Sequence, residues 1–187
     1  TVKVESEVLR ETQLVVCLLF QYAGMSFVDF AHLKERNIKN GILDYNRQKT
    51  GTPMRLEILD TAELMRKELM GDKRPASGYL FPFLSGTKTG YEAYLEYNAA
   101  LSRFNRNLKA LKKAAGIASD VTSYTIRHSF AMALKEQNVP IEMISELLGH
   151  KSIKTTQIYL RSFSLEKMTE VNSTCFGCVY NYVSKVG

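Results

Sequence analysis

Residues 123–160 decide the fold, and they read SYTIRHSFAMALKEQNVPIEMISELLGHKSIKTTQIYL. Three polar residues in this stretch have complementary chemistry: Arg127, His150 and Tyr159. A guanidinium grips phosphate oxygens bidentately, an imidazole donates or shuttles a proton near neutral pH, and a phenol can serve as a covalent nucleophile. The three residues together indicate an enzyme that attacks a phosphodiester.

Capping signals divide this stretch into three helices. The Thr-Ser pair at 122–123 supplies the N-cap of a helix that carries Arg127. Pro140 begins a second helix, which Gly149 ends. Ser152 caps a third helix, which we expect to run through the tyrosine to about residue 161. A further helix is expected at 165–171.

Upstream of this stretch, apolar periodicity predicts helices at 8–22, 27–35, 61–70 and 91–115. In the last of them the expected core stripe is Tyr94, Leu95, Leu101, Phe104, Leu108 and Leu111. After a turn at 37–41, alternating residues at 42–46 and 54–58 predict a β-hairpin. A third, edge strand is expected at 79–81, before Pro82. The predicted fold is mainly α-helical with a small three-stranded antiparallel β-sheet.

Composition sets outer bounds on function. The chain has 187 residues, a length that suits one domain. Its net charge of +6 permits nucleic-acid binding. No apolar run approaches the ~20 residues of a membrane span. The three cysteines, with no framework spacing, favour a reducing, cytoplasmic setting. The pair at 175 and 178 lacks the further ligands of a structural zinc site, so no metal is expected.

The motifs resemble those of the catalytic domain of the tyrosine recombinases, the phage-integrase and Xer family. Residues 127–131 resemble the helix of the family's second arginine, and 147–152 resemble its Leu-Gly-His segment. Residues 155–159 resemble its nucleophile segment, and Lys49 in the hairpin turn resembles its catalytic lysine. Four motifs in the right order and spacing are much more specific than any one of them. The resemblance covers nearly the whole chain.

The resemblance implies a role for each residue. Tyr159 would attack the scissile phosphate of double-stranded DNA, forming a 3′-phosphotyrosyl link and releasing a 5′-hydroxyl. Lys49 would protonate that leaving oxygen. Arg127 would neutralise the non-bridging oxygens, and His150 would donate to the same phosphate or orient it. No cofactor and no obligatory metal are implied.

Two positions depart from the family pattern. Ser26 stands where the family has its first arginine, followed by Asp29 at the place of a bracing carboxylate. Ser26 is interpreted as a helix N-cap, and the residue that replaces the arginine is left open. Some integrases of conjugative and mobilisable elements look similar here. Tyr124 stands where the family has a histidine three residues before Arg127, and His128 is interpreted as structural.

Basic residues beside the nucleophile are candidates for DNA phosphate contacts. They are Lys151, Lys154 and Arg161. In the family, the segment after the nucleophile often docks on a neighbouring protomer, and a tetramer forms on DNA. The tail at 172–187 fits packing in cis or in trans equally well. The family's N-terminal DNA-binding domain has no counterpart here, so residues 1–187 are expected to be a single catalytic domain.

The resemblance implies site-specific recombination, with integration or excision of a mobile element as its outcome. One alternative is nicking and religation like that of a type IB topoisomerase. Another is a catalytically impaired DNA-binding domain, because Ser26 and Tyr124 replace two family residues.

Overall fold

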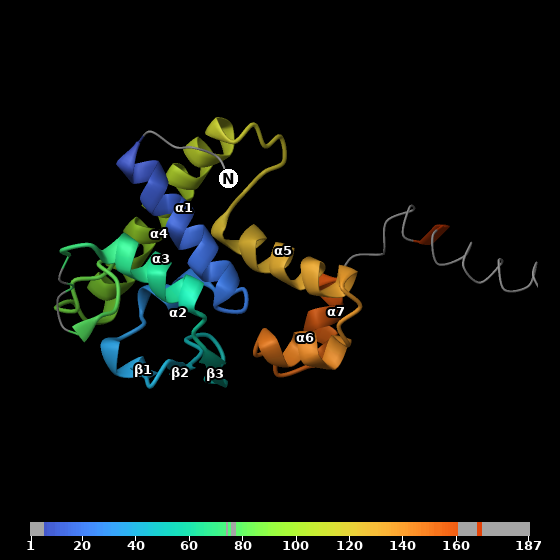
Figure 1. Cartoon of the computed structure of the whole chain (residues 1–187). Coiled ribbons are helices and arrows are strands. Elements are labelled where there is room, and N and C mark those ends of the chain that lie inside the picture. The colour runs from blue at the N-terminus through green and yellow to red at the C-terminus, as the bar shows by residue number, and fades with distance from the viewer. Residues whose placement is uncertain (1–5, 74, 76–77, 161–167, 170–187) are drawn as a thin grey trace, which may run out of the picture.

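A computed structural model of the chain describes residues 6–73, 75, 78–160 and 168–169. Most of these residues form helices, and one small sheet lies at the lower edge of the molecule in Figure 1. The larger, N-terminal part contains helices α1 (Glu7–Gln21), α2 (Phe27–Ala31), α3 (Asp60–Met70) and α4 (Gly90–Ala114). It also contains a 3₁₀ turn (Glu35–Asn37) and strands β1 (Ile38–Lys39), β2 (Ile42–Asn46) and β3 (Pro53–Glu57). The C-terminal part contains α5 (Ser123–Glu136), α6 (Ile141–Leu147) and α7 (Ile153–Tyr159).

The main hydrophobic core is built around α1, which packs against α3, α4 and α5. Its apolar face buries residues such as Leu18 and Leu19. Aromatic rings fill the space between α2 and α4, where Phe27 stacks on Phe104 with ring centroids 4.7 Å apart. Burying aromatic rings removes much apolar surface from water, and this burial fixes α2 in place.

The sheet is three-stranded and antiparallel, in the order β1-β2-β3, which confirms the predicted hairpin and sheet. The predicted third strand is wrong. Strand β1 occupies that place, and Tyr79 makes only an isolated bridge to Lys34. The expected turn at 37–41 is in fact this short strand followed by Asn40 and Gly41, whose positive φ angles of 52° and 75° make a tight hairpin turn.

Helices α5, α6 and α7 share a second, smaller hydrophobic cluster. It consists of Ala131, Ile144 and Leu148, with partly buried neighbours that include Phe130 and Leu160. In Figure 1, α5 runs from the main body to α6 and α7, and β3 lies on the side nearest α6. The α5 residue Ile126 belongs to the main core, so α5 connects the two clusters.

Three helix predictions need correction. The second helix ends at Ala31 instead of residue 35, because the chain turns there to make the bridge at Lys34. Helix α3 begins at Asp60, one residue before the predicted start, and has its N-cap at Leu59. Tyr94 and Leu95 of α4 are exposed, since that helix extends past the core at its N-terminal end. The helix expected at 165–171 lies outside the described residues, apart from 168–169. Across the described parts of the chain, no helix is both long and apolar enough to span a membrane.

Candidate functional site

Arg127 lies where the two hydrophobic clusters meet. It is on α5, whose start is fixed by a capping box between Thr122 and Thr125. Its guanidinium is only 4% exposed and donates from one terminal nitrogen to the carbonyl oxygen of Gly24 at 2.8 Å. The other terminal nitrogen donates to the carbonyl oxygen of Leu148. The predicted phosphate-binding arginine is therefore held rigidly between α1 and the end of α6.

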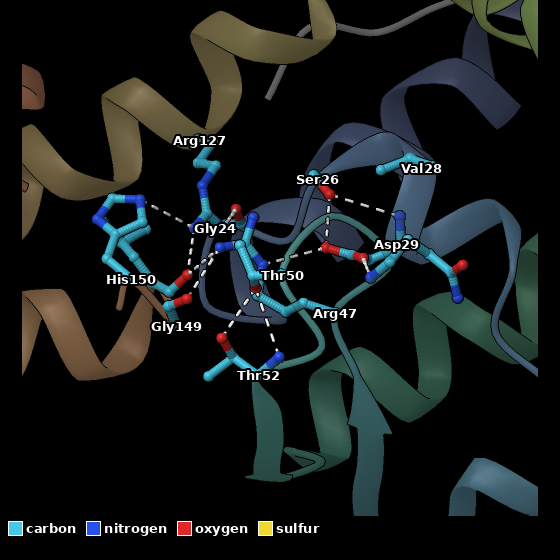
Figure 2. Close-up of polar contacts among 12 residues, drawn as sticks. Gly24, Ser26, Val28, Asp29, Arg47, Thr50, Thr52, Arg127, Gly149 and His150 are labelled. Carbon is cyan, nitrogen blue, oxygen red and sulfur yellow. Dashed lines mark hydrogen bonds and ion pairs between the residues drawn. The ribbon is translucent and has the colours of Figure 1, made fainter. Parts of the chain in front are cut away.

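A second buried arginine, Arg47, reaches the same place from the hairpin (Figure 2). One of its terminal nitrogens donates to the carbonyl oxygens of Leu148 and Gly149, at 3.1 and 3.0 Å. The two guanidinium groups thus share the Leu148 carbonyl oxygen. Two cations brought so close in a poorly hydrated place create a strongly positive potential that favours an anion.

Asp29 holds the hairpin arginine. Its carboxylate is almost fully buried and accepts from Arg47 Nε at 3.5 Å. It also accepts from the Gln48 backbone N–H at 2.7 Å and from the Ser26 hydroxyl at 2.6 Å. Figure 2 shows this carboxylate between α2 and the hairpin turn. The single buried carboxylate offsets only one of the two guanidinium charges, so the cluster keeps a net positive charge.

The hairpin approaches the end of α6 closely because residue 149 is glycine. Gly149 has a φ of 60°, which glycine adopts without the strain of other residues. A Cβ atom there would collide with Met54 Sδ and would lie 2.8 Å from Arg47 Cδ. The glycine therefore ends α6, as predicted, and also makes room for the second arginine.

His150 follows this glycine and faces Arg127. Its Nε2 lies 3.4 Å from a terminal nitrogen of Arg127, and its Nδ1 lies 2.8 Å from the hydroxyl oxygen of Thr156. Burial, and then the positive charges of Arg127 and Arg47, lower the pKa of His150 from its usual 6.5 to about 4. The imidazole is therefore neutral at pH 7 in the DNA-free protein.

The structure brings Arg127 and His150 together, and Lys49 and Tyr159 lie on the adjoining segments. Lys49 is exposed in the hairpin turn, two residues after Arg47. This turn is closed by hydrogen bonds from Gly51 N–H to the Arg47 carbonyl and from Arg47 N–H to the Thr52 carbonyl. Tyr159 is the last residue of α7, and its side chain is not among those described.

The remaining predicted residues are more dispersed. Ser26 is the N-cap of α2, as interpreted, with its hydroxyl accepting from the Asp29 N–H at 3.4 Å. Tyr124 is exposed on the first turn of α5, and His128 is half-buried on the same helix. Lys151 and Lys154 are exposed near the start of α7. Arg161 and the tail at 172–187 lie outside the described residues.

Arg47 is the residue that sequence reasoning missed. The inward positions of β2 are Leu43 and Tyr45, and the same alternation continued by one step puts residue 47 on the buried face. A basic residue at an inward position just past a strand is unusual, because a buried arginine needs partners. The alternation of β2, continued to position 47, could therefore have indicated a buried arginine there.

The described side chains do not resemble a metal site. No group of three or more histidine, cysteine, aspartate or glutamate side chains that could hold a metal ion occurs within the part of the chain that the structure covers. The site has an excess of donors and positive charge, with one neutral imidazole. Such an arrangement can bind a phosphodiester and stabilise charge that develops on its oxygens.

Comparisons with known proteins identify the family of the chain. The sequence model described as "Phage integrase family" matches residues 4–166. The chain is 52% identical over 54 residues to the tyrosine recombinase XerD of Lacticaseibacillus casei, a match covering 29% of this chain and 18% of that protein. These similarities confirm the family resemblance seen in the sequence.

Solved structures share the fold. The XerA recombinase superposes with a TM-score of 0.63 at 21% identity, covering 93% of this chain and 64% of that one. The Tn1549 transposon integrase, in complex with a circular intermediate DNA, gives a TM-score of 0.64 at 14% identity, covering 90% and 60%. The chain thus spans less than two thirds of the length of these relatives. By its sequence match and its fold, the chain belongs to the phage integrase family.

Proposed function

We propose that this chain is the catalytic domain of a tyrosine recombinase, which cuts and rejoins double-stranded DNA at specific sites. The observation that carries the proposal is the pair of buried guanidinium groups, Arg127 and Arg47, that share the Leu148 carbonyl oxygen beside His150. Phosphoryl transfer depends mainly on positioning and on charge stabilisation, and this cluster supplies both.

In the proposed cleavage step, the Tyr159 oxygen forms a bond to the scissile phosphorus and the bond to the 5′-oxygen breaks. The tyrosine hydroxyl loses its proton to solvent water, and the ammonium group of Lys49 gives a proton to the departing 5′-oxygen. The product is a 3′-phosphotyrosyl link and a free 5′-hydroxyl. Attack by a 5′-hydroxyl reverses the step, and rejoining therefore needs no external energy source.

Arg47 takes the role of the family's first arginine in this proposal. Ser26 removes a positive charge from the phosphate clamp, and Arg47 restores one from a different segment. One of its terminal nitrogens donates to the same Leu148 carbonyl oxygen as a terminal nitrogen of Arg127, so the two guanidinium groups lie side by side. This substitution argues against the impaired DNA-binding alternative, because the number of buried cations at the site is preserved.

The biological reaction we propose is integration or excision of a mobile element, with four copies of the protein assembled on DNA. The resemblance of the segment around Ser26 to integrases of conjugative and mobilisable elements supports this choice. Lys151 and Lys154, exposed near the start of α7, are proposed to contact phosphates that flank the scissile one. Arg161 is proposed to do the same, on the sequence pattern alone.

A nicked suicide DNA substrate tests the proposal. Wild type, with its N-terminal region present where the natural protein has one, is expected to form a covalent protein–DNA adduct that survives denaturing electrophoresis. Tyr159→Phe should form none, and Arg106→Ala, which removes an exposed arginine of α4, should behave as wild type. If wild type binds the DNA site tightly but forms no covalent adduct, the proposed enzymatic function is refuted. Relaxation of supercoiled DNA without strand exchange would favour the topoisomerase-like alternative.

A further inference from the structure

His150 is held between two partners that together fix which ring nitrogen carries its proton. Its Nε2 lies 3.4 Å from a terminal nitrogen of Arg127. A guanidinium has only N–H donors and no acceptor, so this long contact favours the tautomer that has its lone pair on Nε2 without fixing it alone. The shorter contact, 2.8 Å from Nδ1 to Thr156 Oγ1, completes the assignment: with the hydroxyl oxygen as acceptor, the single proton of the neutral ring is on Nδ1.

Thr156 is well placed to define this tautomer. It is fully buried and lies on α7, one helical turn before Tyr159. A buried hydroxyl in a helix has little freedom to choose other partners, so its oxygen is a fixed acceptor for Nδ1–H. The contact also ties the imidazole to the helix of the proposed nucleophile.

We propose that Thr156 is a positioning residue for His150: by accepting the Nδ1 proton, its hydroxyl keeps Nε2 as the one ring nitrogen able to gain a proton when a phosphate enters. This inference rests on the proposed function, because it assumes that the anion is the scissile phosphate. The phosphate's negative charge next to Nε2 favours uptake of one proton from solvent at that atom. The resulting imidazolium then donates Nε2–H to a phosphate oxygen, while Nδ1–H stays on Thr156.

The charges around the ring explain why proton uptake waits for the phosphate. Arg127 faces it from α5 and Arg47 from the hairpin, and both cations oppose its protonation. Asp29 lies on the far side of Arg47 as its ion-pair partner. Burial acts in the same direction, and together these effects hold the pKa of His150 at about 4 in the DNA-free protein. An incoming phosphodiester anion offsets the net positive charge of the cluster and so removes much of this opposition to protonation.

Nitrogen-15 NMR of the imidazole tests the tautomer in the DNA-free chain. The protein has three histidines, so signals are assigned by replacing each one in turn. Wild type and Thr156→Ser should show a protonated Nδ1 and an unprotonated Nε2 at pH 7. Thr156→Val, of nearly the same volume, should lose this preference. Thr155→Val, at the exposed neighbouring position, is the matched control and should keep it. A protonated Nε2 in wild type, or an unchanged tautomer in Thr156→Val, overturns the proposal.

Cleavage of the nicked substrate over a range of pH supplies the functional readout. Thr156→Val should cut about tenfold more slowly, because the imidazolium loses a charge-assisted hydrogen bond. The alkaline limb of its pH profile should move down by about one unit, since one pKa unit corresponds to a tenfold change in equilibrium. Thr156→Ser should stay within about twofold of wild type. A merely structural contact would leave the limb in place.

The two measurements separate the two possible failures. If wild type forms no covalent adduct, the proposed function fails, and the tautomer of His150 still decides whether Thr156 positions it. If wild type cleaves and Thr156→Val matches it in both rate and pH profile, Thr156 has no positioning role while the recombinase proposal stands. Thermal unfolding of each variant confirms that the comparison is made between folded proteins.

Discussion

Replacing Arg47 by methionine tests the central feature of the proposed site. Methionine has a similar reach and preserves apolar packing, but it cannot donate hydrogen bonds. The change removes two donations to the carbonyl oxygens of Leu148 and Gly149. It also removes the ion-pair partner of Asp29, which stays buried with its contacts to Ser26 and the Gln48 N–H.

The expected loss of stability follows from these contacts. Removing one partner of a buried ion pair typically costs about 3–5 kcal/mol, because the remaining charge is left in a poorly hydrated place. Replacing both partners at once avoids that penalty, so Arg47→Met with Asp29→Asn should be more stable than Arg47→Met alone. For catalysis, loss of one donor that stabilises transition-state charge costs on the order of 10²–10³ in rate. The double variant should therefore recover stability without recovering cleavage.

Urea unfolding and adduct formation on a nicked substrate measure these two quantities separately. Arg106→Ala, on the exposed face of α4, controls for the general loss of positive charge. Adduct formation by Arg47→Met at a rate within about twofold of wild type would refute the assignment of Arg47 to the phosphate clamp, since one lost charge contact predicts a far larger effect. A stable Arg47→Met protein would refute the account of the ion pair.

Three further predictions concern neighbouring residues. Gly149→Ala should destabilise the protein by about 1–3 kcal/mol in urea unfolding. The new Cβ would clash with Met54 and Arg47, and residue 149 has a positive φ that alanine adopts only with strain. A variant as stable as wild type would contradict this packing. Lys49→Ala should slow cleavage by about 10²–10⁴-fold. A substrate with sulfur as the 5′-bridging atom should restore the rate, because a thiolate leaves without needing a proton. Failure of this substrate to restore the rate would exclude the general-acid role. The pKa of His150 is lowered to about 4, so its contribution to stability is complete above pH 6.5 and is lost as pH falls toward 4. The urea midpoint should therefore fall more between pH 7 and pH 4.5 in wild type than in His150→Asn, and equal falls would contradict the shift.

Local signals predicted the parts of the fold that depend on local chemistry. The cap of α5 is Thr122, one of the two predicted residues, and the stop at Gly149 is where the sequence places it. Helix α6 begins at Ile141, directly after Pro140, which is its N-cap. Strands β2 and β3 follow from alternation. The third strand was missed because a two-residue strand is too short to show a period, although Asn40 and Gly41 carry a strong turn signal.

The parts that the sequence did not predict depend on contacts between distant segments. Whether Tyr94 is buried depends on where α1 ends relative to α4, which no local pattern records. The role of Arg47 depends on its meeting Leu148, which is 101 residues away in the chain. Family motifs identified Arg127 and His150 in the sequence. At Ser26 the sequence departs from the family motif, so the residue that compensates for the missing arginine could be identified only from the fold.

Because both arginines bind the Leu148 carbonyl oxygen, the geometry of the site depends on the relative position of the two hydrophobic clusters. Arg127 is hydrogen-bonded to Gly24 and Arg47 is paired with Asp29, and both partners lie in the main body. Leu148 belongs to the smaller cluster, and His150 contacts Thr156 of α7. A displacement of about 1 Å between the two clusters would misalign both cations and the imidazole at once, and misplacement on that scale costs about 10²-fold in rate. Any displacement of the smaller cluster would therefore disturb the proposed site without touching one of its residues.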